Sequence, residues 1–140
     1  GEYSTLEYFG MGPFENYADR NSASVLGLYR QTVQEQFYSY IRPQENGNKY
    51  DVRWVSLTDV RGFGMTVSGN QPVEANIRRY TTMELAEAIH PYDLTPIDGS
   101  VLHINYKMAP LGNESCGPRP LEEYVLYPEH WNFTLIFKLI

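Results

Sequence analysis

The sequence predicts an all-β fold, an antiparallel sandwich of short strands with one short helix. Three observations support this fold class. Apolar and polar side chains alternate in most segments, turn-forming residues separate those segments, and aromatic residues, which favour strands, make up 14% of the chain. Its 140 residues suit one domain, and no repeat of roughly 20–50 residues divides them. We therefore expect a single domain over residues 1–140.

The strands follow from alternation with a period of two residues. At the start, Leu6 and Tyr8 share one face, and near the end Phe133 and Leu135 begin a similar row. The expected strands are residues 5–8, 24–30, 49–57, 63–68, 102–108 and 133–139. Turn-forming residues lie between them at 10–13, 45–48, 98–99 and 117–120.

The one predicted helix lies near residues 82–90. It begins with a capping box, in which Thr81 and Glu84 satisfy each other's free backbone amides. Leu85 and Ile89 follow on one face, four residues apart, and a proline directly after the segment ends the helix. We expect both apolar side chains to pack on a sheet.

Composition excludes several classes of partner. The net charge of −6 and pI of about 5.0 argue against nucleic acid, whose binding requires clustered basic residues. No apolar run approaches the roughly 18–20 residues that span a membrane. Cys116 is the only cysteine, so no disulfide is expected within the chain. The chain opens on Gly1 without an initiator methionine, so we interpret it as a piece of a longer protein whose compartment stays open.

Spacing alone predicts no catalytic or metal-binding constellation. The three histidines show no metal-ligand spacing, and His103 is expected to be exposed on its strand. Glu122 and Glu123 are adjacent, so on a strand they would point to opposite faces, which does not suit an acid and nucleophile about 5 Å apart. We expect no catalytic residue, metal ligand or cofactor in this chain.

Three segments resemble one known family. Residues 10–20, GMGPFENYADR, are similar to the G-x-G-P-x-E-N-Y-x-D-R motif of the C-terminal (small-chain) domain of family 2 glycoside hydrolase β-galactosidases. Residues 40–47, YIRPQENG, resemble its Y-x-x-P-x-E-N-G motif. Residues 102–108, LHINYKM, resemble its L-N-I-D strand and lead into LGNES at 111–115, where the family has a loop ending D-D-S-W. The three segments occur in the family's order across nearly the whole chain.

The resemblance implies a fold, an activity and partners. The fold is an antiparallel two-sheet supersandwich like that of galactose mutarotases, and the intact domain would begin upstream of residue 1. The parent enzyme would remove terminal non-reducing β-D-galactose with retention, using two glutamates, Mg²⁺ and Na⁺ in a separate catalytic barrel of a homo-oligomer. This chain would support the barrel and be inactive alone. Two alternatives remain, a carbohydrate-binding sandwich module and a purely structural interaction domain.

The resemblance also implies a substrate-binding loop on the aglycone side. Its residues are Asn113, Glu114, Ser115 and Cys116. The family has Trp where this chain has Cys116, and a thiol offers no face on which a sugar can stack. We expect an aglycone side that is more open, with lactose in doubt as the preferred substrate. The alternative is that Cys116 is a small buried packing residue.

We expect the first two motifs to be structural. Their residues are Gly12, Pro13, Glu15, Asn16, Tyr17, Asp19, Arg20, Glu45, Asn46 and Gly47. The opening glycines are expected to adopt positive φ, and Asn16 or Asp19 to cap a helical turn. Arg20 should pair with Glu15. In the second motif the Asn-Gly pair predicts a turn, with the preceding glutamate accepting backbone amides.

Overall fold

A computed structural model of the chain describes residues 4–112, 114 and 116–140. In these residues the strands are β1 (Thr5–Gly12), β2 (Val25–Thr32), β3 (Lys49–Thr58), β4 (Gly64–Arg78), β5 (Val101–Asn105) and β6 (Leu135–Leu139). The helices are α1 (Thr82–Glu87) and three single 3-10 turns, η1 (Gln34–Gln36), η2 (Pro91–Asp93) and η3 (Glu122–Tyr124). The predicted all-β class is confirmed.

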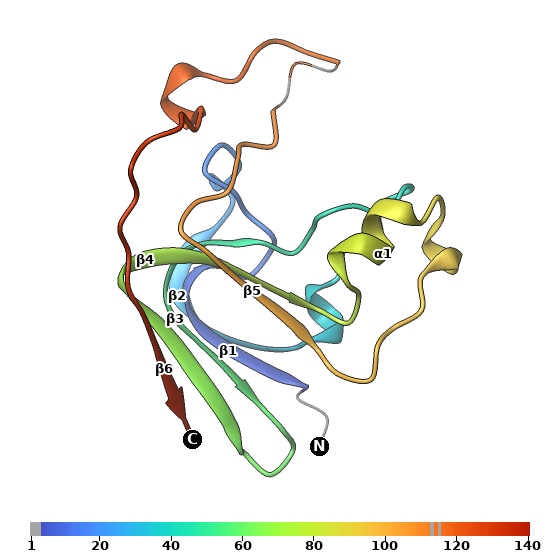
Figure 1. Ribbon diagram of the computed structural model, residues 1–140, viewed down its shortest axis with the longest axis vertical. Helices are drawn as coiled ribbons and strands as arrows, with labels where there is room; N and C mark the ends of the chain where they lie inside the picture. Colours follow the sequence, from blue (N-terminus) through green and yellow to red (C-terminus); the bar gives the residue numbers. More distant parts are fainter. Residues whose placement is uncertain (1–3, 113, 115) are drawn as a thin grey trace.

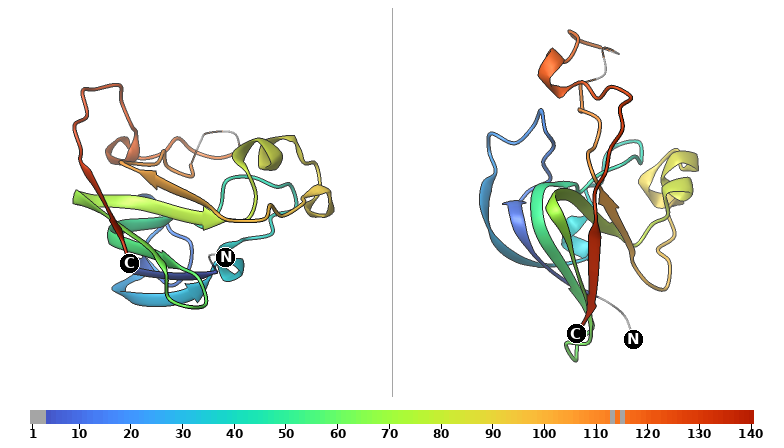
Figure 2. Two further views of the ribbon diagram at one scale, coloured as in Figure 1. Left: turned by 60° about the horizontal axis from the view of Figure 1, so that its bottom comes forward. Right: turned by 60° about the vertical axis from the view of Figure 1, so that its left-hand side comes forward.

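The six strands form one antiparallel sheet in the order β2-β1-β3-β4-β5, with β6 also paired to β4 (Figure 1). The 15-residue strand β4 therefore carries two partners along one edge. Its first half pairs with β6, from Met65 to Gly69, and its second half pairs with β5, from Glu74 to Arg78. The β3–β4 register shifts between Lys49 and Trp54. The sheet is strongly curved (Figure 2), which is consistent with the predicted sandwich.

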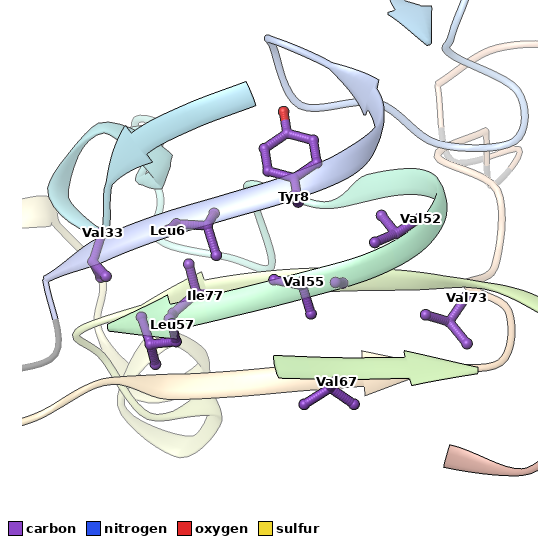
Figure 3. Close-up of a cluster of buried hydrophobic side chains, with 10 residues drawn as sticks. Leu6, Tyr8, Val33, Val52, Val55, Leu57, Val67, Val73 and Ile77 are labelled. Carbon is purple, nitrogen blue, oxygen red and sulfur yellow. The ribbon is translucent and has the colours of Figure 1, made fainter. Parts of the chain in front are cut away.

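The core lies on one face of this sheet (Figure 3). Alternation places every second side chain there, so Leu6 and Tyr8 of β1 meet Val55 and Leu57 of β3. The full buried cluster is Leu6, Tyr8, Val33, Val52, Val55, Leu57, Val67, Val73, Ala75 and Ile77. Burial of side chains of this size stabilises the fold by about 1.5–3 kcal/mol each.

The opposite face carries a row of side chains that crosses five strands and is apolar except at Ser68 of β4. We call it the outer-face row, and its members pair in register as Leu28, Phe9, Trp54, Ser68 and Ile136. Leu28 is 63% exposed and Ile136 is 57% exposed. Phe9 and Trp54 between them are half-buried, and the Arg53 guanidinium lies over the Phe9 ring. The isolated chain therefore presents apolar surface to water.

The predicted helix is only partly right. Thr81 accepts a hydrogen bond from the Glu84 N–H at 3.1 Å, which confirms the helix start. The second half of the predicted capping box is wrong, because the Glu84 carboxylate accepts the Thr95 N–H at 2.6 Å. Leu85 is buried but does not belong to the core cluster of the sheet, α1 is six residues long and Ile89 is 61% exposed. The helix ends early because the Asp93 carboxylate accepts the Ile89 and His90 N–H groups at 3.2 and 2.9 Å, which begins η2.

The two C-terminal strand predictions also need correction. β5 ends at Asn105, so Tyr106 and Met108 lie beyond it. In β6 alternation does not separate a buried face from an exposed one, because Ile136 and Phe137 are both exposed. Both faces of β6 are exposed because β6 pairs with β4 alone and no described element packs over it.

Candidate functional site

The first two motifs meet at the buried carboxylate of Glu15. This carboxylate accepts the Gly47 N–H at 2.9 Å, the Arg20 guanidinium at 3.1 Å and the Tyr40 hydroxyl. The predicted Glu15–Arg20 pair is confirmed. Tyr17 is buried beside them, and burial followed by the charge of Glu15 raises the pKa of its hydroxyl. One carboxylate thus joins residues 10–20 to residues 40–47.

Asn16 fixes the path of the first motif. Its side-chain amide donates to the carbonyls of Met11 and Phe14 at 3.0 and 2.8 Å, and its oxygen accepts the Tyr50 N–H at 2.6 Å. Its own N–H donates to the Asn48 carbonyl at 2.9 Å. The expectation that Asn16 or Asp19 caps a helical turn is wrong, because the partners of Asn16 lie in β1, in irregular loops and in β3, and Asp19 accepts N–H groups of a distant loop.

The glycines of the first motif act through close packing rather than through positive φ, so that expectation is also wrong. Among the described glycines, positive φ occurs at Gly47, Gly62 and Gly99. Gly12 lies in β1, where an added Cβ would sit 2.3 Å from the hydroxyl oxygen of Tyr8. Its bond to Pro13 is cis.

The second motif forms the predicted Asn-Gly turn, with Gly47 at φ +77°. Asn46 holds it by accepting the Tyr38 N–H at 3.0 Å. Glu45 was expected to accept backbone amides, but its carboxylate accepts side chains of β4, the Asn76 amide at 2.6 Å and the Arg78 guanidinium at 2.7 Å. That expectation is wrong, because both partners lie in the second half of β4, which the sequence-based prediction did not include.

Lys49 is a buried charge that sequence reasoning missed. Its side chain is enclosed at 2% exposure, and its ammonium donates to the Gly47 carbonyl at 3.1 Å. Burial lowers the pKa of Lys49 to about 8, while the negative charge of Glu15 opposes the shift. The only signal in the sequence is its position at the start of a strand, directly after the Asn-Gly turn.

Arg78 organises a second polar cluster at the end of β4. Its buried guanidinium also donates to the Thr82 hydroxyl at 3.0 Å and lies 3.1 Å from Nε2 of His103. His103 is half-buried rather than exposed as expected, because the buried guanidinium of Arg78 lies against its ring. Burial, followed by the charge of Arg78, lowers the pKa of His103.

Asp19 connects the first motif to the predicted substrate-binding loop. Its two carboxylate oxygens accept the N–H groups of Leu111 and Gly112, each at 3.0 Å, across 92 and 93 residues of sequence. We call this contact the Asp19 clamp. It holds the base of the loop at the end of the molecule far from both chain termini (Figures 1 and 2).

The structure describes part of the loop itself. Asn113 and Ser115 lie outside the described residues. Glu114 pairs with Arg119 at 3.3 Å and has φ +64°. Cys116 is exposed, so it is not a buried packing residue of this chain.

Two further searches apply to the described part of the chain. It contains no group of three or more His, Cys, Asp or Glu side chains placed to hold a metal ion. Its helices are all too short to cross a bilayer.

Comparison with known proteins identifies the family. Residues 1–137 match the family described as "Beta galactosidase small chain". The chain is 38% identical over 136 residues to a β-galactosidase of Actinobacillus pleuropneumoniae, covering 96% of this chain and 13% of that protein. It is 38% identical over 138 residues to a β-galactosidase of Priestia megaterium, covering 98% and 13%. A β-galactosidase of Staphylococcus xylosus is 31% identical over 138 residues, covering 99% and 14%.

The chain thus spans about one-seventh to one-eighth of the length of these relatives. The match covers all three motifs, the Glu15 and Asp19 contacts, strands β1 to β5 and the first part of β6. The chain belongs to the β-galactosidase small-chain family.

Proposed function

We propose that this chain is the C-terminal domain of a β-galactosidase that hydrolyses terminal non-reducing β-D-galactose residues. In this proposal the domain is inactive alone and supports a catalytic barrel elsewhere in the parent protein. The relatives support it, since most of their length lies outside the region that this chain matches. Mg²⁺ and Na⁺, which the resemblance implies for the parent enzyme, would bind in that catalytic barrel.

The observation that carries the proposed site is the Asp19 clamp. Two backbone N–H groups on one carboxylate fix the loop base in position and direction. The exposed thiol of Cys116 follows four residues after Gly112. We propose that this loop borders the aglycone side of the galactose pocket and that the small Cys116 leaves this side open.

The outer-face row supports the structural part of the proposal. Exposed side chains such as Leu28 and Ile136 share one face with Trp54, and together they cross the sheet. Exposed apolar side chains gathered on one face are typical of a face that packs against another part of a protein. A free-standing carbohydrate-binding module has less support, because a stable module would cover this face itself.

The isolated chain is therefore expected to release no nitrophenol from nitrophenyl β-galactoside. Retaining hydrolysis requires two carboxyl groups about 5–5.5 Å apart around the bond that breaks. Glu15 is occupied by Gly47, Arg20 and Tyr40, and Glu122 lies in the single turn η3. Turnover that survives repurification and disappears in Glu15→Gln or Glu122→Gln would overturn this expectation.

The loop proposal is tested by Cys116→Trp in the full-length parent enzyme. An indole at this position should change KM for disaccharides and leave kcat for nitrophenyl galactoside nearly intact, because the contact is remote from bond cleavage. Cys116→Ser is the matched control, since it keeps the small size. Unchanged KM across several aglycones in a folded Cys116→Trp enzyme would remove the loop from the site.

A further inference from the structure

A cleft of about 340 Å³ lies beside the Asp19 clamp, apart from the exposed loop. Its walls come from separate segments: Tyr50 of β3, Glu74 of β4, Lys107 and Met108 after β5, and Glu123 and Tyr124 of η3. The motif of residues 10–20 contributes one further wall through Ala18. A smaller cavity of about 170 Å³ shares Tyr50, Glu74 and Lys107 and continues along the sheet.

Glu74 is the fixed polar group of this cleft. It is buried, and its carboxylate accepts the Met108 N–H at 2.9 Å and the Asn48 amide at 2.5 Å. A carboxylate has about four lone-pair sites, so it can accept further donors from a ligand. Burial raises the pKa of Glu74 because no close cation offsets the lost hydration fully, although Lys107 opposes the shift.

The other lining groups combine aromatic rings with donors and acceptors. Tyr50 and Tyr124 supply rings, and the Glu123 carboxylate accepts a hydrogen bond from the Tyr124 hydroxyl, which raises the pKa of that hydroxyl. Lys107 supplies an ammonium donor. Aromatic faces with a few placed hydrogen-bonding groups match the C–H faces and hydroxyls of a sugar ring.

We propose that this cleft is a saccharide-binding site of the chain, suited to one neutral pyranose ring in the larger cavity, with room for a second along the smaller one. The ring would lie against Tyr50 or Tyr124, donate hydroxyl hydrogens to Glu74 and accept from Lys107. The site goes beyond the proposed role in the enzyme, since it needs no residue of the catalytic region and does not include Cys116.

Charge separates a sugar from other small ligands. The carboxylates of Glu74 and Glu123 line the cleft with one ammonium, and the Asp19 charge acts on both Glu74 and Tyr124. An anion is disfavoured by this negative balance. The same negative balance attracts a cation, so a small cation is the competing ligand that the titration has to exclude. A fully apolar ligand would cover Glu74 without offering a donor.

The test is an NMR titration of the isolated chain with methyl β-D-galactopyranoside and with lactose. We expect saturable shifts at Tyr50, Lys107, Met108 and Tyr124 with a millimolar Kd. Tyr124→Ala should weaken binding about fivefold or more by removing a ring face. Tyr92→Ala, which removes an exposed tyrosine ring in η2, is the matched control and should leave Kd unchanged. Lys107→Ala is a second variant that should also weaken binding, and it changes a side chain outside the core.

Three results would overturn the proposal. They are no saturable shift with either sugar, equal shifts with ethylammonium or inorganic phosphate, or the same Kd in Tyr124→Ala, Lys107→Ala and Tyr92→Ala. The outcome is separate from the proposed enzymatic role, because full-length Tyr124→Ala should still hydrolyse nitrophenyl galactoside.

Discussion

At the residue scale, stability depends on carboxylates that serve several segments at once. Glu15 accepts from Gly47, Arg20 and Tyr40, and its charge also acts on the buried ammonium of Lys49. Hydrogen bonds to a charged group contribute about 1.5–3 kcal/mol each, more than neutral ones. Loss of this one charge therefore affects two motifs and a neighbouring cation.

We predict that Glu15→Gln lowers the free energy of unfolding by about 2–4 kcal/mol. The side-chain amide of the variant has one acceptor oxygen where the carboxylate has two, so its NH₂ group would face one of the present donors and leave that donor unpaired. Lys49 would also lose the negative charge that opposes its own. Urea unfolding followed by tyrosine fluorescence measures the change. Glu87→Gln, at the exposed end of α1, is the control and should stay within about 0.5 kcal/mol. Equal effects in the two variants would contradict the role of Glu15.

At the element scale, the sequence pattern predicts strands best where one face of the strand is buried and the other faces solvent. β1 is such a strand, with Leu6 and Tyr8 inside. The second half of β4 was missed although Val73, Ala75 and Ile77 alternate with polar residues there. Pro72 interrupts the run, and the polar face is itself buried, which the alternation of hydrophobicity does not reveal.

The site was predicted unevenly for a similar reason. The Glu15–Arg20 pair and the Asn-Gly turn depend on neighbours in sequence, so local patterns were sufficient. The Asp19 clamp and the Glu45–Arg78 pair join residues 92 and 33 positions apart, and their partners became visible only with the fold. The cleft beside the clamp draws its walls from five segments and has no local sequence pattern.

The turn before β3 gives a prediction at this scale. Gly47→Ala should cost about 3 kcal/mol or more, because φ is +77° and the new Cβ would lie 2.5 Å from the Gln36 carbonyl oxygen. Gly62→Ala is the matched control. Its φ is +88° but the space around it is open, so only the conformational cost of about 1–2 kcal/mol is expected. Equilibrium unfolding of both variants separates steric overlap from backbone strain, and equal losses would exclude the overlap.

At the scale of the whole molecule, the outer-face row leaves apolar side chains exposed at both ends, at Leu28 and Ile136. The sheet buries one face and presents Leu28, Trp54 and Ile136 on the other. β2 stands at the edge of the sheet, so Leu28 lies where another chain can approach.

We predict that the isolated chain self-associates through this face and that Leu28→Glu reduces the association. The substitution should change the free energy of unfolding by no more than about 0.5 kcal/mol, because the side chain is already exposed. Sedimentation velocity across a concentration series measures the effect. Ile89→Glu changes a side chain of similar exposure away from the sheet and should leave association unaltered. If both variants associate like the original chain, the row is not the contact.

The two partners on one edge of β4 have a consequence for synthesis on the ribosome. β3 and β4 are separated by a short turn, so they can pair as soon as both emerge, with little loop-closure entropy. The stretch from Met65 to Gly69 must wait for β6, made more than sixty residues later. During that interval its backbone donors and acceptors form an open edge, which is a template for pairing with other nascent chains. We expect dependence on chaperones to be greatest in this window and to end when residues 135–139 leave the exit tunnel.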